Sequence, residues 1–449
     1  MKYTVILIIL SITLGAQGEG WKAGAASQII TPEEPVWMAG YGGRKEPAAG
    51  KRTDLFAKAL LLEDKNGHVG LILTLDLVGM DKGFADRVTE AISKKHSLSR
   101  EQIAICTSHT HSGPVVAQNL SPLHYLSLGE DEQKKIDAYA EVLLKHITTV
   151  TDAAFAAKVP ARLQHGSGKC TFAVNRRENK PYETVPEKRT SGLLRGPVDH
   201  DVPVLTVRGE DDSLLAILFG YACHATTLSL NEWNGDYPGY AQAELEKAFP
   251  GSVALFWAGC GGDQNPLPRK EVSLAEDYGA DLAARVGDVI NAPMGELEPK
   301  LSTHYSLIDA PLKALPGTDA IEKNKTSTNR FEVARANYLQ RKIAKEGPLK
   351  KSYPYPVGNW IIGNKIDFVF LGGEVVIDYA LRLKQERRGT NTWVAGYAND
   401  VMAYIPSLRV LKEGGYEGGE SNVYYGLPSL WDGTIEEVII SAVPGVPTP

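Results

Sequence analysis

The sequence reads Thr-Ser-His-Thr-His-Ser-Gly-Pro from Thr107 to Pro114, directly after the apolar run Gln102–Cys106 that indicates a buried strand. In an extended backbone, His109 and His111 point to the same side, so both imidazoles can face one point. Neutral imidazole is the commonest nitrogen ligand of zinc, and the end of a strand holds it rigidly. The stretch therefore indicates a metal site, with a pair of hydrogen-bonded surface histidines as the alternative.

The composition is typical of a globular protein large enough to bury a sizeable core. The chain has 449 residues, of which 43% are hydrophobic and 23% charged, and its formal net charge is −6. A nucleic-acid-binding protein needs a basic face, which this balance does not favour. We therefore expect no nucleic-acid partner.

The N-terminus is typical of a secretory signal peptide. Met1 and Lys2 precede the apolar run Val5–Leu14, and the small residues Gly15 to Gly18 follow it. The run is too short to span a bilayer comfortably, and no cysteine follows that could carry a lipid. We predict a signal peptide at residues 1–18, a mature domain at residues 21–449, export to the periplasm or the medium, and no stable membrane anchor.

The four cysteines allow two interpretations. In an oxidising compartment Cys106, Cys170, Cys223 and Cys260 could form two disulfides. A core of this size needs no covalent cross-links, however, and three of the four lie within a few residues of the motifs described below. We expect buried thiols that pack as small hydrophobic side chains.

Hydrophobic periodicity predicts alternating strands and helices, with a hairpin turn at residues 64–67. The other expected strands and helices are listed here: strands at residues 55–63, 68–75, 202–207, 214–222, 253–257, 365–371 and 392–396; helices at 84–95, 136–154, 240–249, 275–290 and 331–344. Residues 21–52 look irregular, and Trp37–Gly43 is their least ordinary part. Residues 317–329 are expected to form a polar linker or a long surface loop. This order predicts one large mixed α/β domain with more than one sheet.

Polar residues stand at the ends of the predicted buried strands. His109 and His111 follow one strand, His224 the next, and Asp263 a third; Glu374 and the group Asn399, Asp400 and Tyr404 follow two more. In sheet-based enzymes, ligands collect beyond the carboxyl ends of the strands. Histidines, carboxylates and a tyrosine in these places predict a metal-dependent hydrolase site.

The set of motifs resembles the neutral (non-lysosomal) ceramidases. The motifs occur in that family's order, from about Ala23 to Glu420, and the His-x-His run is the most specific of them. The stretches that carry the resemblance are Ser108–Pro114, Ala222–Thr227, Asn234–Gly239, Gly262-Asp263, Gly373-Glu374, Tyr404-Ile405 and Tyr416-Glu417.

The resemblance implies a Zn²⁺ ion held by His109, His224, Glu374 and Tyr404. It also implies that His111 lies beside the ion as an acid/base or substrate-orienting group. Arg176, next to Asn175, is implied to face the site, and Tyr416 falls where a second site tyrosine is expected. Two imidazoles, a carboxylate and a phenol leave zinc room for a water whose pKa the metal lowers.

The sequence departs from the family pattern in two places. Asn265 stands in Gly262–Pro266 where ceramidases have a serine, so we expect attack by a zinc-bound hydroxide, with His111 or Asp263 as proton acceptor. Arg176 or Tyr416 would then steady the oxyanion. The chain also ends at Pro449, so we expect no C-terminal immunoglobulin-like domain. Both departures put ceramide itself in doubt.

The function predicted from the sequence is an exported zinc-dependent hydrolase that cleaves an amide bond of an N-acylsphingosine-like small molecule. One alternative is the same fold acting on an ester, amide or glycosidic bond of a carbohydrate or other polar substrate. Another is an amidohydrolase barrel, but eight regular βα units are not found. A further alternative is a non-catalytic binding module that keeps the fold.

Overall fold

The computed structural model describes residues 20–445. Its largest element is a nine-stranded mixed sheet in the order β11-β9-β8-β6-β1-β3-β4-β5, with β13 paired to β6. The strands are β1 (Trp21–Ile29), β3 (Phe56–Glu63), β4 (Val69–Leu75), β5 (Ile103–Thr107), β6 (Val159–Lys169), β8 (Asp201–Gly209), β9 (Leu214–Tyr221), β11 (Val253–Ala258) and β13 (Gly295–Glu296). The predicted signal peptide lies outside the described residues.

A second sheet of four strands, in the order β14-β15-β16-β18, packs on one face of the first. Its strands are β14 (Leu301–Pro311), β15 (Ser352–Ile362), β16 (Ile366–Leu371) and β18 (Asn391–Ala395). Buried residues of both sheets form one apolar cluster, in which Leu218 and Leu255 meet Trp360 and Phe368. Burial between two sheets is the main source of stability for such an arrangement.

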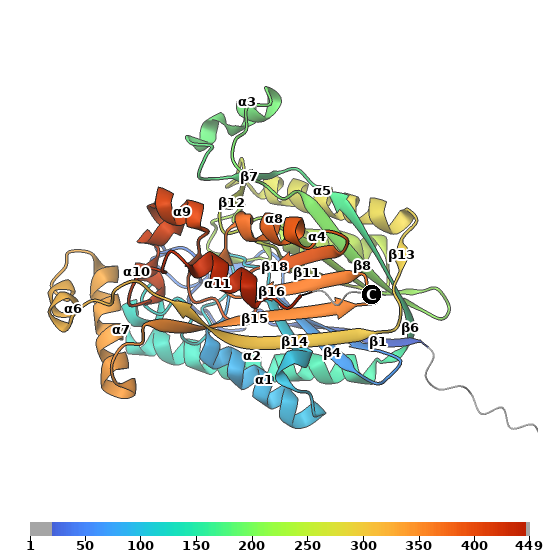
Figure 1. The fold of residues 1–449 in the computed structure, drawn as a ribbon, viewed down its shortest axis with the longest axis horizontal. Helices are drawn as coiled ribbons and strands as arrows, with labels where there is room; N and C mark the ends of the chain where they lie inside the picture. The colour runs from blue at the N-terminus through green and yellow to red at the C-terminus, as the bar shows by residue number, and fades with distance from the viewer. Residues whose placement is uncertain (1–19, 446–449) are drawn as a thin grey trace, which may run out of the picture.

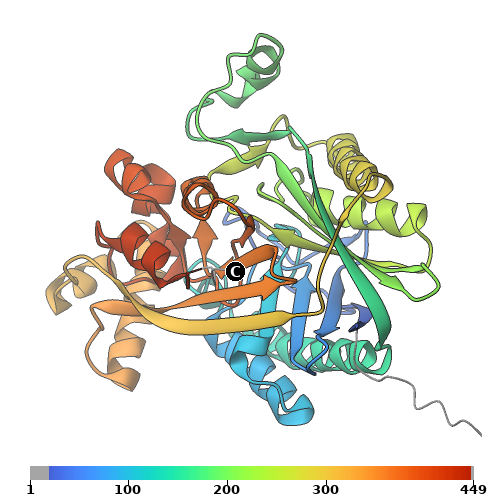
Figure 2. The same cartoon turned by 45° about the vertical axis from the view of Figure 1, so that its right-hand side comes forward.

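Helices cover the outer faces of both sheets, which gives four layers (Figures 1 and 2). On the large sheet, α1 (Lys82–His96) and α2 (Glu130–Ala156) cover one half, and α4 (Asp236–Ala248) and α5 (Val272–Asn291) cover the other. On the small sheet lie α8 (Ile377–Glu386) and α11 (Ile435–Ala442). The predicted mixed α/β domain with more than one sheet is confirmed.

Shorter elements complete the chain. They are the two-stranded pairs β2 (Gly50–Lys51) with β10 (Glu232–Trp233), β7 (Ala173–Asn175) with β12 (Gln264–Pro266) and β17 (Glu374–Val375) with β19 (Tyr404–Ile405), and the helices α3 (Val185–Thr190), α6 (Thr318–Asn324), α7 (Arg330–Glu346), α9 (Leu408–Glu413) and α10 (Asn422–Tyr425). Among the described helices, none combines the length and the apolar character that a bilayer span requires.

The prediction that residues 21–52 are irregular was wrong for Trp21–Ile29, which forms β1 between β6 and β3. The strand is rich in Ala and Gly because α2 packs directly against it. A Cβ on Gly24 would stand 2.1 Å from the carbonyl oxygen of Ala154. This close approach excludes the β-branched residues by which a strand is usually recognised.

Other differences concern element boundaries and one short helix. The residues predicted to form a linker at 317–329 contain α6, and α4 begins at Asp236 rather than Tyr240. The predicted hairpin at residues 64–67 is confirmed, since β3 and β4 pair antiparallel around a left-handed Gly67. All four cysteines are buried free thiols, as expected from the size of the core.

Candidate metal centre

The loops that carry the candidate residues meet because one segment joins both edges of the large sheet. The chain that leaves β18 forms one bridge from Ala395 to Gly259, after β11, and another from Ala398 to Cys106, in β5. These bridges bring the carboxyl ends of β5, β9, β11 and β16 to one place. The strand-end residues singled out in the sequence are therefore neighbours in space.

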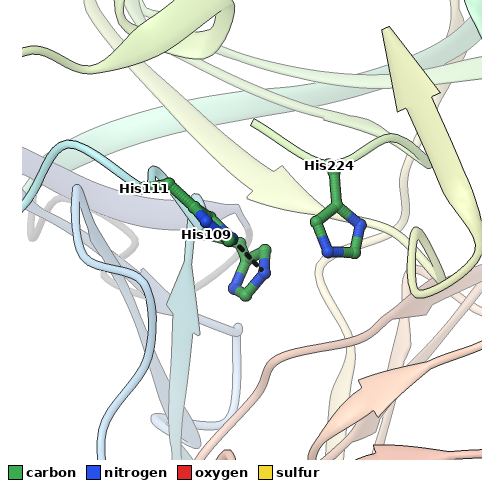
Figure 3. Close-up of side chains that lie close together, drawn as sticks. All are labelled: His109, His111 and His224. Carbon is green, nitrogen blue, oxygen red and sulfur yellow. Dashed lines mark hydrogen bonds between the residues drawn. The ribbon is translucent and has the colours of Figure 1, made fainter. Parts of the chain in front are cut away.

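His109 and His111 extend from the loop after β5, and Figure 3 shows their rings together with that of His224. His109 has a left-handed φ of 58°, an unfavourable conformation for a residue with a side chain and one typical of functional sites. Its Nδ1 lies 2.5 Å from the carbonyl oxygen of Val78. Since a carbonyl only accepts, Nδ1 carries the proton and Nε2 presents its lone pair to the site.

His224 is fixed in the same way from the loop after β9. Its Nδ1 lies 2.6 Å from the carbonyl oxygen of Gly261, so its Nε2 also presents a lone pair. Burial, aided by the positive charge of Arg176, lowers the pKa of His224 to about 4. Burial and the neighbouring imidazoles also hold the pKa of His111 well below its usual range. Both rings are therefore neutral, as metal ligands or proton acceptors must be.

Glu374 and Tyr404 are brought together by backbone pairing, because they are register partners in the parallel β17–β19 ladder. Glu374 Oε2 lies 3.2 Å from His109 Nε2 and 3.0 Å from His224 Nε2. The other oxygen, Oε1, accepts a hydrogen bond from Tyr425. The phenol oxygen of Tyr404 lies 3.2 Å from His224 Nε2.

These atoms fit a divalent cation such as zinc. The buried Glu374 Oε2 has no hydrogen-bond donor among the described residues, and two imidazole lone pairs face it. Such a group is costly to bury unless a cation satisfies it. The ring nitrogens of His109, His111 and His224 lie within 4.8 Å of one another, so His111 is near enough to be a further ligand.

Arg176 and Asn265 lie beside this cluster because β7 and β12 pair antiparallel, with Asn265 opposite Val174. The Arg176 guanidinium donates to Asn265 Oδ1 at 3.3 Å and to the Tyr404 phenol at 3.0 Å. Burial opposes its charge, but Tyr404 and Glu417 hold the pKa of Arg176 well above its usual range. Arg176 is therefore a permanently charged donor at the site.

Tyr416 lies at the mouth, where its side chain is 43% exposed and its ring centroid is 5.3 Å from that of Tyr404. The glycine-rich segment around it, Glu413–Glu420, is anchored through the buried Glu417. This carboxylate forms ion pairs with Arg176 at 2.7 Å and Arg177 at 2.6 Å. The glycine-rich segment is therefore held at Glu417, beside Arg176 and Arg177.

Asp263 is close to Asn265 in the sequence but does not line the cavity. Its carboxylate accepts hydrogen bonds from Asn175 Nδ2, Gln264 Nε2 and the backbone N–H of Ile377, at 2.9–3.0 Å. These bonds tie the β12 turn to the start of α8. Asp263 therefore has a supporting role in this geometry, and of the two proton acceptors expected from the sequence only His111 faces the cavity.

A cavity of about 540 Å³ opens in front of the cluster. His111, His224, Tyr404 and Asn265 line it, together with residues from loops far apart in the chain. The remaining lining residues are Gly40, Tyr41, Arg176, Arg177, Glu178, Lys180, Tyr182, Thr226, Arg269 and Glu413–Glu417.

Several contributors were not identified from the sequence. Gly40 and Tyr41 pack against His111, with the Tyr41 ring centroid 4.8 Å from the imidazole centroid. Tyr397 stacks on His109 with centroids 4.2 Å apart. Trp37–Gly43 stood out in the sequence, but no pattern linked it to His111. Arg269 follows the Asn265 turn and carries no motif of its own.

The family model described as "Neutral/alkaline non-lysosomal ceramidase, N-terminal" matches residues 21–267. Among curated proteins, the chain is 26% identical over 296 residues to a neutral ceramidase of Drosophila pseudoobscura pseudoobscura. It is 24% identical over 295 residues to that of Drosophila melanogaster. Each alignment covers 64% of this chain and 38% of the relative, so the chain matches well under half the length of either protein.

Two solved structures share the fold. The neutral ceramidase from Pseudomonas aeruginosa superposes with a TM-score of 0.70 at 19% identity, over 94% of this chain and 73% of that one. A structure titled "Ceramidase complexed with C2" superposes with a TM-score of 0.69 at 17% identity, over 94% of this chain and 74% of that one. Similarity therefore extends beyond the residues that the family model matches.

Proposed function

The chain belongs to the neutral/alkaline non-lysosomal ceramidase family, and we propose that it is a zinc-dependent hydrolase that cleaves the amide bond of an N-acyl substrate. The observation that carries the proposal is the convergence of His109 Nε2, His224 Nε2 and the donor-less Oε2 of Glu374. With Tyr404 these residues would hold the ion. When bound, zinc supplies Lewis-acid chemistry and an activated water.

We propose that His111 is the proton acceptor and donor of the reaction. Its Nε2 faces the ligand cluster, 3.1 Å from His109 Nε2, and burial keeps the ring neutral at physiological pH. A neutral imidazole here can take a proton from the attacking water and return it to the leaving amine. Arg44 supports the position of His111, because its guanidinium donates to the His111 carbonyl oxygen at 2.7 Å.

Arg176 would stabilise the oxyanion that develops on the substrate carbonyl. Its guanidinium is charged and is held by Glu417 on the side away from Asn265 and Tyr404. A donor fixed before the reaction needs no reorganisation when charge develops, which is the main source of such catalysis. Asn265 would orient the substrate, because an amide can donate a hydrogen bond but is not a nucleophile.

The metal and the reaction can be tested together on the purified full-length protein. We expect about one zinc per chain by elemental analysis, hydrolysis of N-acyl amides that stops after chelation, and recovery of activity on adding zinc. Zinc-free protein that still hydrolyses these amides would contradict a metal-dependent reaction. Zinc-free protein without any hydrolysis would favour a binding module with the same fold.

A second candidate function is hydrolysis of a carbohydrate or other polar substrate by the same residues. The lining of the cavity favours this candidate: every side chain there is polar, charged or a tyrosine. Export of the protein is also a proposal, carried by the charged and apolar pattern of residues 1–18 alone. N-terminal sequencing of the secreted protein would test it.

A further inference from the structure

The cavity has a lining that is more polar than apolar. Among the described residues that line it, none has an aliphatic side chain, and its aromatic rings are Tyr41, Tyr182, Tyr404 and Tyr416, with His111 and His224. Burial of a methylene group contributes about 0.8 kcal/mol, so a lipid-binding cavity is expected to be apolar. This cavity is instead suited to a hydrophilic substrate.

The cations of the cavity divide into two kinds. Arg176 and Arg177 are in ion pairs, with Glu417 shared between them and Glu413 bound to Arg177. Arg269 and Lys180 also line the cavity, but neither lies within 4.0 Å of a carboxylate in the described part of the chain. Among residues 20–445, the Arg269 guanidinium has only a long contact of 3.5 Å, to the Thr226 carbonyl oxygen.

A hydrogen-bonding group without a partner lies beside Arg269. Thr226 lines the same cavity and is 3% exposed, and its hydroxyl has no partner among residues 20–445. A buried hydroxyl without a partner is uncommon in a folded protein and indicates a ligand or solvent contact. The positive charge of Arg269 and this hydroxyl thus lie in the same cavity as His111 and Asn265.

The charge continues onto the adjoining surface. Two smaller hollows of about 270 and 320 Å³ share Tyr41 with the cavity, and their charged lining residues are Arg44, Lys45, Arg330 and one carboxylate, Glu46. None of these three cations is in an ion pair within the described residues, although the chain as a whole carries a net charge of −6. Unpaired cations around a recess raise the local concentration of anions.

We propose that the substrate is a hydrophilic molecule that carries a carboxylate, sulfate or phosphate group, and that Arg269 binds this group beside the scissile bond. A guanidinium binds such oxyanions in a planar, bidentate manner, and the Thr226 hydroxyl can add a third hydrogen bond. Lys180, Lys45 and Arg330 guide the anion to the site. The inference rests on the proposed function for its reaction and on Arg269 for its specificity.

Two matched pairs of N-acyl compounds test the proposal and separate the two sources of anionic charge. One pair is N-acetylglucosamine and its 6-sulfate, and the other is a short-chain ceramide and its 1-phosphate. We expect the anionic member of at least one pair to bind more tightly by calorimetry and to have a higher kcat/KM. Arg269→Gln should reduce this preference about tenfold or more, and Arg269→Lys should retain part of it.

Lys65→Gln is the matched control: Lys65 is an exposed cation in the β3–β4 turn, has no ion pair with any described residue, and should not affect the preference. The preference should also weaken with added salt, because salt screens exposed charges. Binding of the anionic compound without hydrolysis would refute the proposed function but would still support anion recognition by Arg269. Anion recognition by Arg269 would be overturned by any of three results: equal affinity for the neutral and anionic members, no binding of either anion, or a preference that is unchanged in Arg269→Gln.

Discussion

Gly40 lies directly against the imidazole of His111: a Cβ at this position would stand 2.4 Å from His111 Cγ. Gly40 also has a left-handed φ of 93°, which residues with a side chain rarely adopt. The Gly40 N–H also donates a hydrogen bond to His124 Nε2 at 3.0 Å, which holds the loop around Gly40 in place. Glycine is thus required here for two independent reasons, and both concern the placement of His111.

We therefore predict that Gly40→Ala displaces His111 and lowers kcat by about tenfold or more while bound zinc stays near the wild-type amount. Gly43→Ala is the control, because Gly43 is in the same loop and a Cβ there meets no atom within 4 Å. Steady-state kinetics with elemental analysis would check the prediction. Loss of zinc in Gly40→Ala would show instead that the segment supports the ligands.

Substitutions of the three histidines should separate ligands from the proton acceptor. We expect His109→Ala and His224→Ala to lose most of their zinc, since each removes one lone pair that faces Glu374. His111→Gln should keep its zinc and lose about a hundredfold or more of kcat, as removal of a general base does. If His111→Gln also loses its zinc, all three histidines are ligands.

Glu417 should control the glycine-rich segment at the cavity mouth. Glu417→Gln leaves two arginines with a weakened partner, and breaking a buried ion pair costs about 3–5 kcal/mol. We expect faster hydrogen exchange in residues 413–420. We also expect a lower kcat, because Arg176 loses the carboxylate that holds it in position. Glu420→Gln is the control, because Glu420 has no ion pair in the described chain. Unchanged exchange in both variants would mean that Glu417 does not anchor the segment.

The sequence was a good guide wherever a strand is apolar and its end is polar. β5, β9 and β16 follow this pattern, and the residues after them, His109, His224 and Glu374, lie together in the structure. β1 could not be predicted, because its composition reflects the close approach of α2 to Gly24 rather than strand propensity. Such contacts between distant segments leave little trace in the local sequence.

The same limit applies to the cavity walls. Tyr41 lies 70 residues before His111 in the sequence and reaches it through tertiary packing, and no motif marks Arg269 as a residue of the cavity. The sequence also could not distinguish the roles of His111 and Asp263 as proton acceptors. Three hydrogen bonds to the Asp263 carboxylate, all within the protein, made that distinction.

Asn265 bears on the course of the reaction. Its amide cannot form an acyl intermediate, and its Oδ1 accepts from Arg176 rather than facing a base. We predict hydrolysis without a covalent enzyme species, so protein quenched within one turnover should show no mass increase. Asn265→Asp, which keeps the shape, should lower kcat because a carboxylate would compete for Arg176. A trapped adduct on any side chain would contradict direct hydrolysis.

The buried His124 should make stability depend on pH below neutrality. Burial, followed by the charges of Arg44 and Arg330, lowers the pKa of His124 to about 3, against 6.5 for an ordinary histidine. Between these values the unfolded chain binds a proton that the folded chain does not, so stability is lost as the pH falls from about 6.5 toward 3. The slope for one proton is about 1.4 kcal/mol per pH unit.

Urea unfolding at several pH values would measure this slope in the wild type and in His124→Gln, whose amide oxygen can still accept from the Gly40 N–H. Between about pH 6 and pH 4, we expect the free energy of unfolding to fall less steeply with pH in the variant than in the wild type. The two slopes should differ by up to the slope for one proton. His146→Gln is the control, because His146 is half-buried on α2 and has no part in the site. Equal slopes in the wild type and His124→Gln would show that His124 takes up its proton in the folded protein, and that the Gly40 contact does not hold it neutral.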